Sequence, residues 1–377
     1  MTTEPIQIDR PDRVGTTLRA SVRFQPNVET ISYTGDLGTD ILIEPFLATV
    51  LLPAMTLGRA VRVSAPVSSQ FLDRLPEAQR MLANWDPALR VVDMDARGGV
   101  VDRRFRRAGT VGSFFSGGVD SFFTVLRHRD RLDYAVFVYG VNSRLRQPAL
   151  HRQVRAAIRR ACRELGLQLV EVTTNAPAIA GSYSRWRFNH GAVLAGIAHT
   201  LVGKIGTMLV PGSLSHDSIF PYGSHPSLDP LLSTEAVEIR YDGIEANRYE
   251  KTAAVATNET VLRFLRVCNN RADPNYNCGM CEKCLRTMVA LHISGSLASC
   301  ATFPSALDLP RVAGVIVPTP GARQLWEQNL AAAVAAEADE QLVDVLRLVV
   351  RRAVRLEDRM EAEGRHRLHR RRSIAGV

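Results

Sequence analysis

The chain has 377 residues, of which 46% are hydrophobic and 23% are charged, and this allows an ample core and two or three domains. The formal net charge is +9, but five arginines between Arg365 and Arg372 account for more than half of it, so the charge is weak evidence for nucleic-acid binding. No apolar stretch is long enough for a membrane span and the N-terminus lacks the form of a signal peptide, so we expect a cytoplasmic protein.

The first 108 residues have the pattern of a separate, β-rich α+β domain. Their apolar residues either alternate with polar ones or form short continuous runs, which is typical of strands. Strands are expected within Thr16–Phe24, Ile41–Leu52, Ala60–Val67 and Leu89–Met94. Gln70–Trp85 carries its apolar residues along one face, which predicts a helix. The basic residues from Arg103 to Arg107 then form a linker to the next domain.

A glycine-rich motif follows an apolar run and precedes another, which predicts a strand, a glycine turn and a helix. Its six residues are Ser116, Gly117, Gly118, Val119, Asp120 and Ser121. The two glycines let the backbone approach an anion, and the helix N-terminus supplies N–H groups and partial positive charge. The two serines add hydroxyl donors, and Asp120 is suited to hold a Mg²⁺ ion beside phosphates.

The motif has neither the Walker A nor the dinucleotide-binding spacing. It resembles the pyrophosphate-binding loop of the N-type ATP pyrophosphatases, the PP-loop superfamily. The resemblance implies a fold of the adenine nucleotide alpha hydrolase-like (HUP) type, with ATP and Mg²⁺ bound by the six motif residues. It also implies that ATP is split to AMP and pyrophosphate, with Asp120 and Ser121 in catalytic roles.

Beyond the loop, short apolar strands alternate with amphipathic helices, which is the pattern of a doubly wound parallel sheet. The expected strands are Tyr134–Tyr139, Leu167–Thr173 and Met208–Val210, and the expected helices are Leu150–Leu165 and His190–Leu201. Ligands of such sheets bind beyond the carboxyl ends of the strands. We therefore expect the adenine ring near Tyr139 and Gly140.

Four of the six cysteines fall within seventeen residues, at Cys268, Cys278, Cys281 and Cys284. This spacing lets the thiolates converge on one ion, and four protein ligands give a structural zinc site without an open position. An iron–sulfur cluster is the alternative. Cys162 and Cys300 lie in apolar contexts and are expected to be small buried residues.

The glycine loop together with the cysteine motif resembles 7-cyano-7-deazaguanine synthase and its relatives. That family activates a deazaguanine carboxylate with ATP and uses ammonia to form a nitrile. The resemblance places Arg187 and Asn189 on the nucleotide side, Lys251 within reach of the phosphates, and substrate contacts around Asp217. Relatives of this fold are often dimeric, which suggests a homodimer.

The chain also departs from that family. About 110 residues precede the loop and about 90 follow the cysteines, and Pro221–Pro226 stands where an Asp-rich pocket sequence is expected. Thr319–Glu363 has the periodicity of two helices. We predict a β-rich domain at 1–108, an ATP-binding domain with the zinc site at 109–300, and a helical extension with a basic tail at 301–377.

The resemblance favours an ATP-dependent ligase that forms a carbon–nitrogen bond. It adenylates an oxygen of a small carboxylic acid or amide, which includes deazapurines, and ammonia or an amine then displaces AMP. His190 and Asp217 are candidates for proton transfer. The alternatives are a PP-loop sulfur transferase acting on tRNA or a metabolite, and a deazaguanine-synthase-like module of a defence or natural-product system. Nucleic acid is a less favoured partner, and no membrane is involved.

Overall fold

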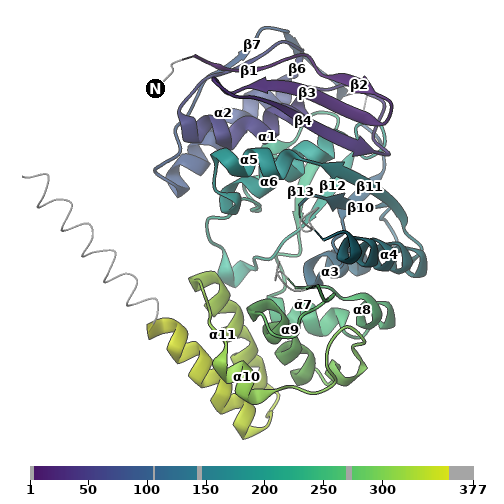
Figure 1. The fold of residues 1–377 in the computed structure, drawn as a ribbon, viewed down its shortest axis with the longest axis vertical. Helices are drawn as coiled ribbons and strands as arrows, with labels where there is room; N and C mark the ends of the chain where they lie inside the picture. The colour runs from purple at the N-terminus through teal and green to yellow at the C-terminus, as the bar shows by residue number, and fades with distance from the viewer. Residues whose placement is uncertain (1–3, 105–106, 142–146, 269–273, 356–377) are drawn as a thin grey trace, which may run out of the picture. The chain divides into compact units, whose positions relative to one another are not determined.

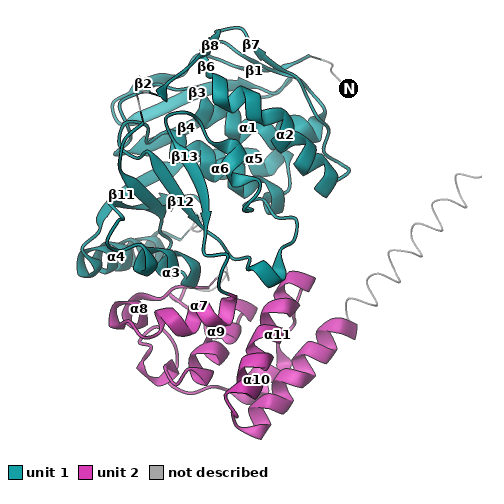
Figure 2. Ribbon diagram, turned by 180° about the vertical axis from the view of Figure 1, so that it is seen from behind, with its two compact units in different colours: residues 1–246 teal, residues 247–377 magenta. Residues whose placement is uncertain are grey.

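The computed structural model describes residues 4–104, 107–141, 147–268 and 274–355. The chain divides into two compact units, residues 1–246 and residues 247–377 (Figure 2). None of the helices in the described part of the chain is long and apolar enough to cross a membrane. The arginine-rich tail predicted after residue 364 lies outside the described residues.

The first unit is a mixed α/β structure built on one large, mostly parallel sheet (Figure 1). Within the described residues the sheet has eleven strands, in the order β13-β12-β9-β10-β11-β4-β3-β1-β5-β7, and β2 pairs with β3. The strands are β1 Ile6–Ile8, β2 Asp12–Val14, β3 Thr17–Arg23, β4 Val28–Gly35, β5 Val61–Val63, β7 Met94–Ala96, β9 Val111–Phe114, β10 Tyr134–Tyr139, β11 Gln168–Thr174, β12 Thr207–Pro211 and β13 Glu238–Asp242. A two-stranded sheet joins β6 (Val67–Ser68) to β8 (Val100–Val101).

Five neighbouring strands, β13 to β11 in that order, are all parallel. β9 is the middle strand of the five, because it pairs with β10 on one side and with β12 on the other. The chain runs from β9 outward to β11 and then crosses back to β12 and β13. The loops that follow β9 and β12 therefore leave the same edge of the sheet side by side.

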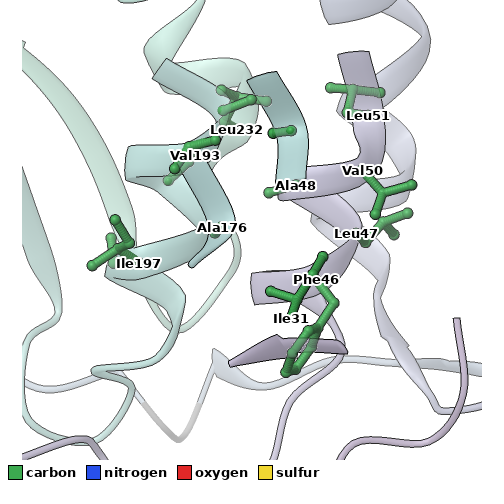
Figure 3. Close-up of a cluster of buried hydrophobic side chains, with 14 of the residues drawn as sticks. Ile31, Phe46, Leu47, Ala48, Val50, Leu51, Ala176, Val193, Ile197 and Leu232 are labelled. Atoms are coloured by element: carbon green, nitrogen blue, oxygen red, sulfur yellow. The ribbon is translucent and has the colours of Figure 1, made fainter. Parts of the chain in front are cut away.

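Helices pack on both faces of these strands. α3 packs on β9 and β12, and α4 packs on β11. On the other face, Val136 and Val138 belong to the core that α1, α5 and α6 share, and Figure 3 shows Val193 and Ile197 in it. The helices of the first unit are α1 Glu44–Leu57, α2 Ser69–Trp85, α3 Val119–Arg127, α4 Pro148–Leu165, α5 Ala176–Tyr183 and α6 Trp186–His199.

The front segment extends this sheet. β4 pairs antiparallel with β11, with Thr34 opposite Thr173, and the contacts continue through β3 to β1, β5 and β7. The predicted boundary at residue 108 therefore lies inside one compact unit, because backbone hydrogen bonds join the two segments. The sequence could not show this pairing, since its partners are about 140 residues apart.

One strand predicted in this segment is a helix. Ile41–Leu52 was expected to form a strand, but α1 begins at Glu44 and ends at Leu57. Nearly all of its residues are buried, so the helix is apolar on every side and lacks the periodicity that reveals an amphipathic helix. Figure 3 shows Phe46, Leu47 and Val50 on this helix.

The remaining predicted elements of the first unit agree with the structure to differing degrees. β10 has the predicted bounds, and α2, α4, α6, β3, β11 and β12 differ from theirs by a few residues. The run from Ala60 to Val67 is split between β5 and β6. The strand expected at Leu89–Met94 was wrong, because only Met94 belongs to a strand, as the first residue of β7; Leu89 and Val92 are buried, but in an irregular segment. Alternating or one-sided burial made the well-predicted elements recognisable.

The second unit is helical and begins at Asn247, so the predicted boundary at residue 300 also lies inside a unit. Its helices are α7 Arg248–Val255, α8 Glu259–Phe264, α9 Glu282–Ile293, α10 Leu309–Gly314 and α11 Pro320–Ala335, and a further helix starts at residue 340 and is described as far as residue 355. Leu285, Trp326 and Leu346 share its core. This unit carries all four clustered cysteines.

Candidate functional site

The glycine motif forms the predicted turn between a strand and a helix. β9 ends at Phe114 and α3 begins at Val119, with Gly118 as the residue before the helix. Gly117 has a φ of 74°, in the left-handed region that glycine adopts without strain. Both the anion-accommodating turn and the helix N-terminus expected from the sequence are therefore present at the carboxyl end of β9.

The two motif serines hold the turn in shape. The Ser121 hydroxyl donates to the Gly118 carbonyl at 3.0 Å and accepts from the Ser116 amide at 3.2 Å. The two hydroxyl oxygens are 3.3 Å apart. Ser121 is buried, whereas Ser116 is half-buried. The serines thus stabilise the loop whether or not a ligand is bound.

Asp120 is contacted by a loop from the neighbouring strand. The exposed Ser213 hydroxyl, two residues after β12, donates to Asp120 Oδ2 at 2.8 Å. These residues are 93 positions apart in the sequence and meet because the loops after β9 and β12 leave the same edge of the sheet. A carboxylate oriented in this way is suited to bind a hard cation such as Mg²⁺.

Tyr241 in β13 fixes the position of that serine. Its hydroxyl accepts a hydrogen bond of 2.7 Å from the Leu214 amide, and its ring packs against Gly212, where a Cβ atom would lie 1.9 Å from the ring. Gly212 therefore permits the close approach, and Tyr241 holds the turn on either side of Ser213. The sequence did not reveal either contact.

The predicted adenine residues lie at the carboxyl end of β10. The Tyr139 ring packs on Phe137, and its hydroxyl donates to Glu171 at 2.9 Å. Burial, followed by the hydrogen bond to Glu171, raises the pKa of the Tyr139 phenol, which therefore stays neutral. Gly140 has a φ of 104°, and a Cβ atom there would lie 2.3 Å from the Thr174 carbonyl oxygen. The Tyr139 side chain is therefore held by its neighbours in the sheet, and the backbone of Gly140 directly follows the carboxyl end of β10.

Three further predicted residues lie in the first two turns of α6. Their contacts are made with the α5–α6 junction and with residues 220–223. The Asn189 amide donates to Ser184 Oγ at 2.8 Å, the Arg187 guanidinium donates to the Pro221 carbonyl at 3.3 Å, and the His190 ring lies 4.5 Å from the Tyr222 ring. Desolvation lowers the pKa of His190 to about 4, so its imidazole is neutral at pH 7.

Asp217 and Lys251, the other predicted catalytic residues, belong to different units. Asp217 is exposed in the 3-10 helix His216–Ser218, four residues after Ser213 on the loop that follows β12. Lys251 is in α7 of the second unit, and only 1% of it is exposed. It is therefore not an ordinary solvated residue of a helix surface.

The four clustered cysteines converge as the sequence predicted. Their sulfur atoms all lie within 4.8 Å of one another. Cys268 and Cys281 are 4.0 Å apart, and Cys278 and Cys284 are 3.8 Å apart. Zinc–thiolate bonds of about 2.3 Å in a tetrahedron place the sulfur atoms about 3.8 Å apart. The set therefore fits one tetrahedral ion, whereas an iron–sulfur cube would hold its thiolates farther apart.

The local backbone explains this convergence. Gly279 has a φ of 66°, and the amide of Cys281 points to Cys278 Sγ at 3.3 Å, so the chain turns tightly between these two ligands. Cys281 caps α9 and Cys284 lies in its first turn. Hydrogen bonds from backbone amides to thiolate sulfur stabilise the deprotonated ligands that a metal requires.

Asn277 positions Cys268, the cysteine that lies apart in sequence from the other three. Its side-chain oxygen accepts from the amides of Val267 and Cys268 at 3.0 and 3.1 Å, and its amide group donates to the Leu265 carbonyl at 2.9 Å. It therefore holds the segment carrying Cys268 beside the turn carrying Cys278. Sequence reasoning missed this role, although an asparagine directly before a ligand cysteine is a usable signal.

Comparison of the chain with protein-family models, with curated proteins and with solved structures found no match. The class of the protein is therefore argued from its own residues.

Proposed function

We propose that the chain is an ATP-dependent ligase of the PP-loop type. It adenylates an oxygen of a small carboxylic acid or amide, releases pyrophosphate, and lets ammonia or an amine displace AMP. The observation that carries the proposal is the glycine turn at the carboxyl end of the middle parallel strand, where Ser213 from the adjoining loop meets Asp120.

The strand order supports a doubly wound sheet of the HUP type. Numbered from β9, the five parallel strands have the order 3-2-1-4-5, and the order reverses between β9 and β12. Open α/β sheets bind ligands in the crevice at such a reversal, beyond the carboxyl ends of the strands. The glycine turn and Ser213 lie on the two loops that flank it.

The residues of the turn fit a triphosphate. Gly118 is half-buried at the turn and Gly117 permits its left-handed backbone, the first amides of α3 would supply donors, and Ser116 would add a hydroxyl. Asp120 would hold Mg²⁺, which screens phosphate charge when it is bound with ATP. Preorganised donors of this kind each contribute about 3–4 kcal/mol to stabilising charge that develops in a transition state.

The second half of the reaction requires removal of a proton from the attacking amine. Asp217 is exposed on the loop after β12, and His190 is neutral at pH 7, so either side chain is able to accept that proton. We propose that the acceptor oxygen belongs to a small carboxylic acid or amide, a class that includes deazapurines.

Two observations on the cysteines complete the proposal. The four clustered thiolates would bind zinc in a structural role, since the set offers four protein ligands to one ion. Sulfur transfer is disfavoured because Cys162 is buried and desolvation raises the pKa of its thiol to about 12. The Cys300 thiol is also buried, and desolvation raises its pKa. Neither thiol provides the reactive thiolate that this chemistry needs.

The proposal is tested by pyrophosphate release from ATP and Mg²⁺ against a panel of small carboxylic acids, with mass spectrometry for an acyl-adenylate. We expect release only with a carboxylic acid or amide present. Asp120→Ala should reduce it at least about a hundredfold, because a metal ligand is lost. Asp130→Ala, at an exposed position just after α3, is the matched control. Equal turnover in the Asp120→Ala protein would refute the assignment.

A further inference from the structure

A second candidate binding site lies in the first unit, away from the glycine loop. An open cavity of about 410 Å³ is lined by the end of α1, the segment that follows α2, and the junction of α5 with α6. Its volume is within the range of small-molecule sites in proteins. It shares no lining residue with the motif at residues 116–121.

Aromatic rings form much of the cavity wall. Tyr183, Trp186 and Phe188 all line it, together with apolar side chains such as Leu89. The Phe24 ring stacks on Tyr183 with centroids 4.1 Å apart and an angle of 15° between the planes, which fixes the tyrosine ring. Trp186 is 37% exposed, so part of a large ring is left without cover. Walls of this kind suit a flat ring.

A buried carboxylate provides the main charge of the cavity. Asp86 is 9% exposed, and its Oδ1 accepts a hydrogen bond from the Ala88 amide at 3.0 Å. Its Oδ2 is 3.5 Å from the guanidinium of Arg185, a side chain that is 77% exposed. A carboxylate accepts about four hydrogen bonds. These two contacts, one of them long, leave Asp86 with capacity for a donor from a ligand.

The other polar groups of the wall are also acceptors. The Ser182 hydroxyl donates to the Ala178 carbonyl and offers its lone pairs, whereas the Ser184 hydroxyl donates to the Ala180 carbonyl and already accepts from the Asn189 amide, so it has one lone pair left. Both serines lie at the carboxyl end of α5, where the helix carries partial negative charge. Arg185 is the only basic residue among the described lining residues, and it is mostly in solvent.

From this combination we propose that the cavity binds a flat aromatic molecule that bears an amine or amidine group. The ring would stack between Tyr183 and Trp186, and the N–H groups would donate to Asp86 in place of the long contact from Arg185. The proposal is independent of the ligase assignment, because it rests on other residues. Binding of a ligand in this cavity is therefore tested without ATP.

Benzamidine and benzoate are suitable probes, because they have the same shape and opposite charge. Isothermal titration of the full chain should show benzamidine binding at least about tenfold more tightly than benzoate. Asp86→Asn should weaken benzamidine binding by about tenfold, since it removes the charge and keeps the shape. Equal affinity for the two probes, or no effect of Asp86→Asn, would overturn the proposal.

A blocking variant keeps the test independent of any folding defect in Asp86→Asn. Gly181 lines the cavity, and a Cβ atom built on it meets no atom within 4 Å. Gly181→Phe should therefore fill the cavity and abolish benzamidine binding, while Gly181→Ala serves as the matched control and retains it. Undiminished binding to the Gly181→Phe protein would place benzamidine elsewhere and overturn the assignment.

Discussion

The indole nitrogen of Trp326 donates a hydrogen bond of 3.0 Å to Glu282 Oε1. Arg286 Nε donates to the same oxygen at 2.7 Å, and Trp326 is fully buried. Glu282 directly follows the metal-ligand candidate Cys281, so this contact ties the first turn of α9 to α11. The four-cysteine cluster and the helices that follow it are thus linked through one carboxylate.

Removal of the indole donor should destabilise the second unit. We expect Trp326→Phe to lower the free energy of unfolding by about 1–3 kcal/mol, because it leaves a half-buried acceptor with one partner fewer and loses ring volume in the core. Urea unfolding measures the change. Combining it with Glu282→Ala, which removes the acceptor oxygen, in a double-mutant cycle isolates the contact, and strictly additive effects would show that Trp326 acts through packing alone.

Metal removal should affect the same unit. Chelation, or Cys281→Ser, should lower the melting temperature of the chain, because structural zinc contributes its binding free energy to folding. Elemental analysis should find about one zinc per wild-type chain. Cys162→Ala is the control, since Cys162 lies outside the cluster and should leave the metal content unchanged. Iron with sulfide in place of zinc would contradict the assignment.

The contact between Ser213 and Asp120 predicts a specific dependence on Mg²⁺. Ser213→Ala should raise the Mg²⁺ concentration needed for half-maximal pyrophosphate release by about tenfold, because the carboxylate loses the donor that orients it. Ser213 is exposed, so thermal stability should not change. Ser213→Thr keeps a hydroxyl and should restore most of the wild-type response. A loss of activity that added Mg²⁺ does not alleviate would count against this role.

Asp229 predicts a pH dependence of stability. Burial raises its pKa to about 7, so the folded chain keeps a proton that the unfolded chain releases near pH 4. The protonated side chain contributes at most about 4 kcal/mol to the free energy of unfolding. This contribution is full below pH 4 and is lost as the pH rises to about 7. Asp229→Asn should abolish this contribution.

The measurement is the difference between wild type and Asp229→Asn in urea unfolding at pH 4.5 and at pH 7.5. Wild type alone would not isolate Asp229, because burial also lowers the pKa of His190 and His199 to about 4. Those two histidines make the free energy of unfolding rise with pH over the same range, and they are present in both proteins. A difference that does not vary with pH would show that Asp229 titrates normally.

Much of the first unit was predictable because its burial follows simple periods. α2 and α4 each have one buried face, and β10 is a short apolar run bounded by turn residues, so their patterns identified them. α1 was not predictable, because it is buried on all sides and an apolar run without alternation fits either a strand or a helix. Tertiary packing decided its conformation.

The candidate sites divide in the same way. Gly117 and the cysteine ligands were found because their chemistry is written in short, contiguous motifs. Ser213 and Asn277 were missed because their roles depend on partners brought near by the fold, across 93 positions for Ser213 and Asp120 and across 9 for Asn277 and Cys268. A single sequence carries no local record of such pairings.

The pairing of β4 with β11 bears on how this protein can be dissected. A fragment that starts at the glycine loop would leave β11 as an edge strand. The backbone amides and carbonyls of β11 that face Tyr33, Thr34 and Gly35 would then be exposed. An exposed edge strand of this kind pairs with strands of other chains and so promotes aggregation. Expression of the chain from the glycine loop onward should therefore yield aggregates, because the front segment and the parallel strands form one folding unit.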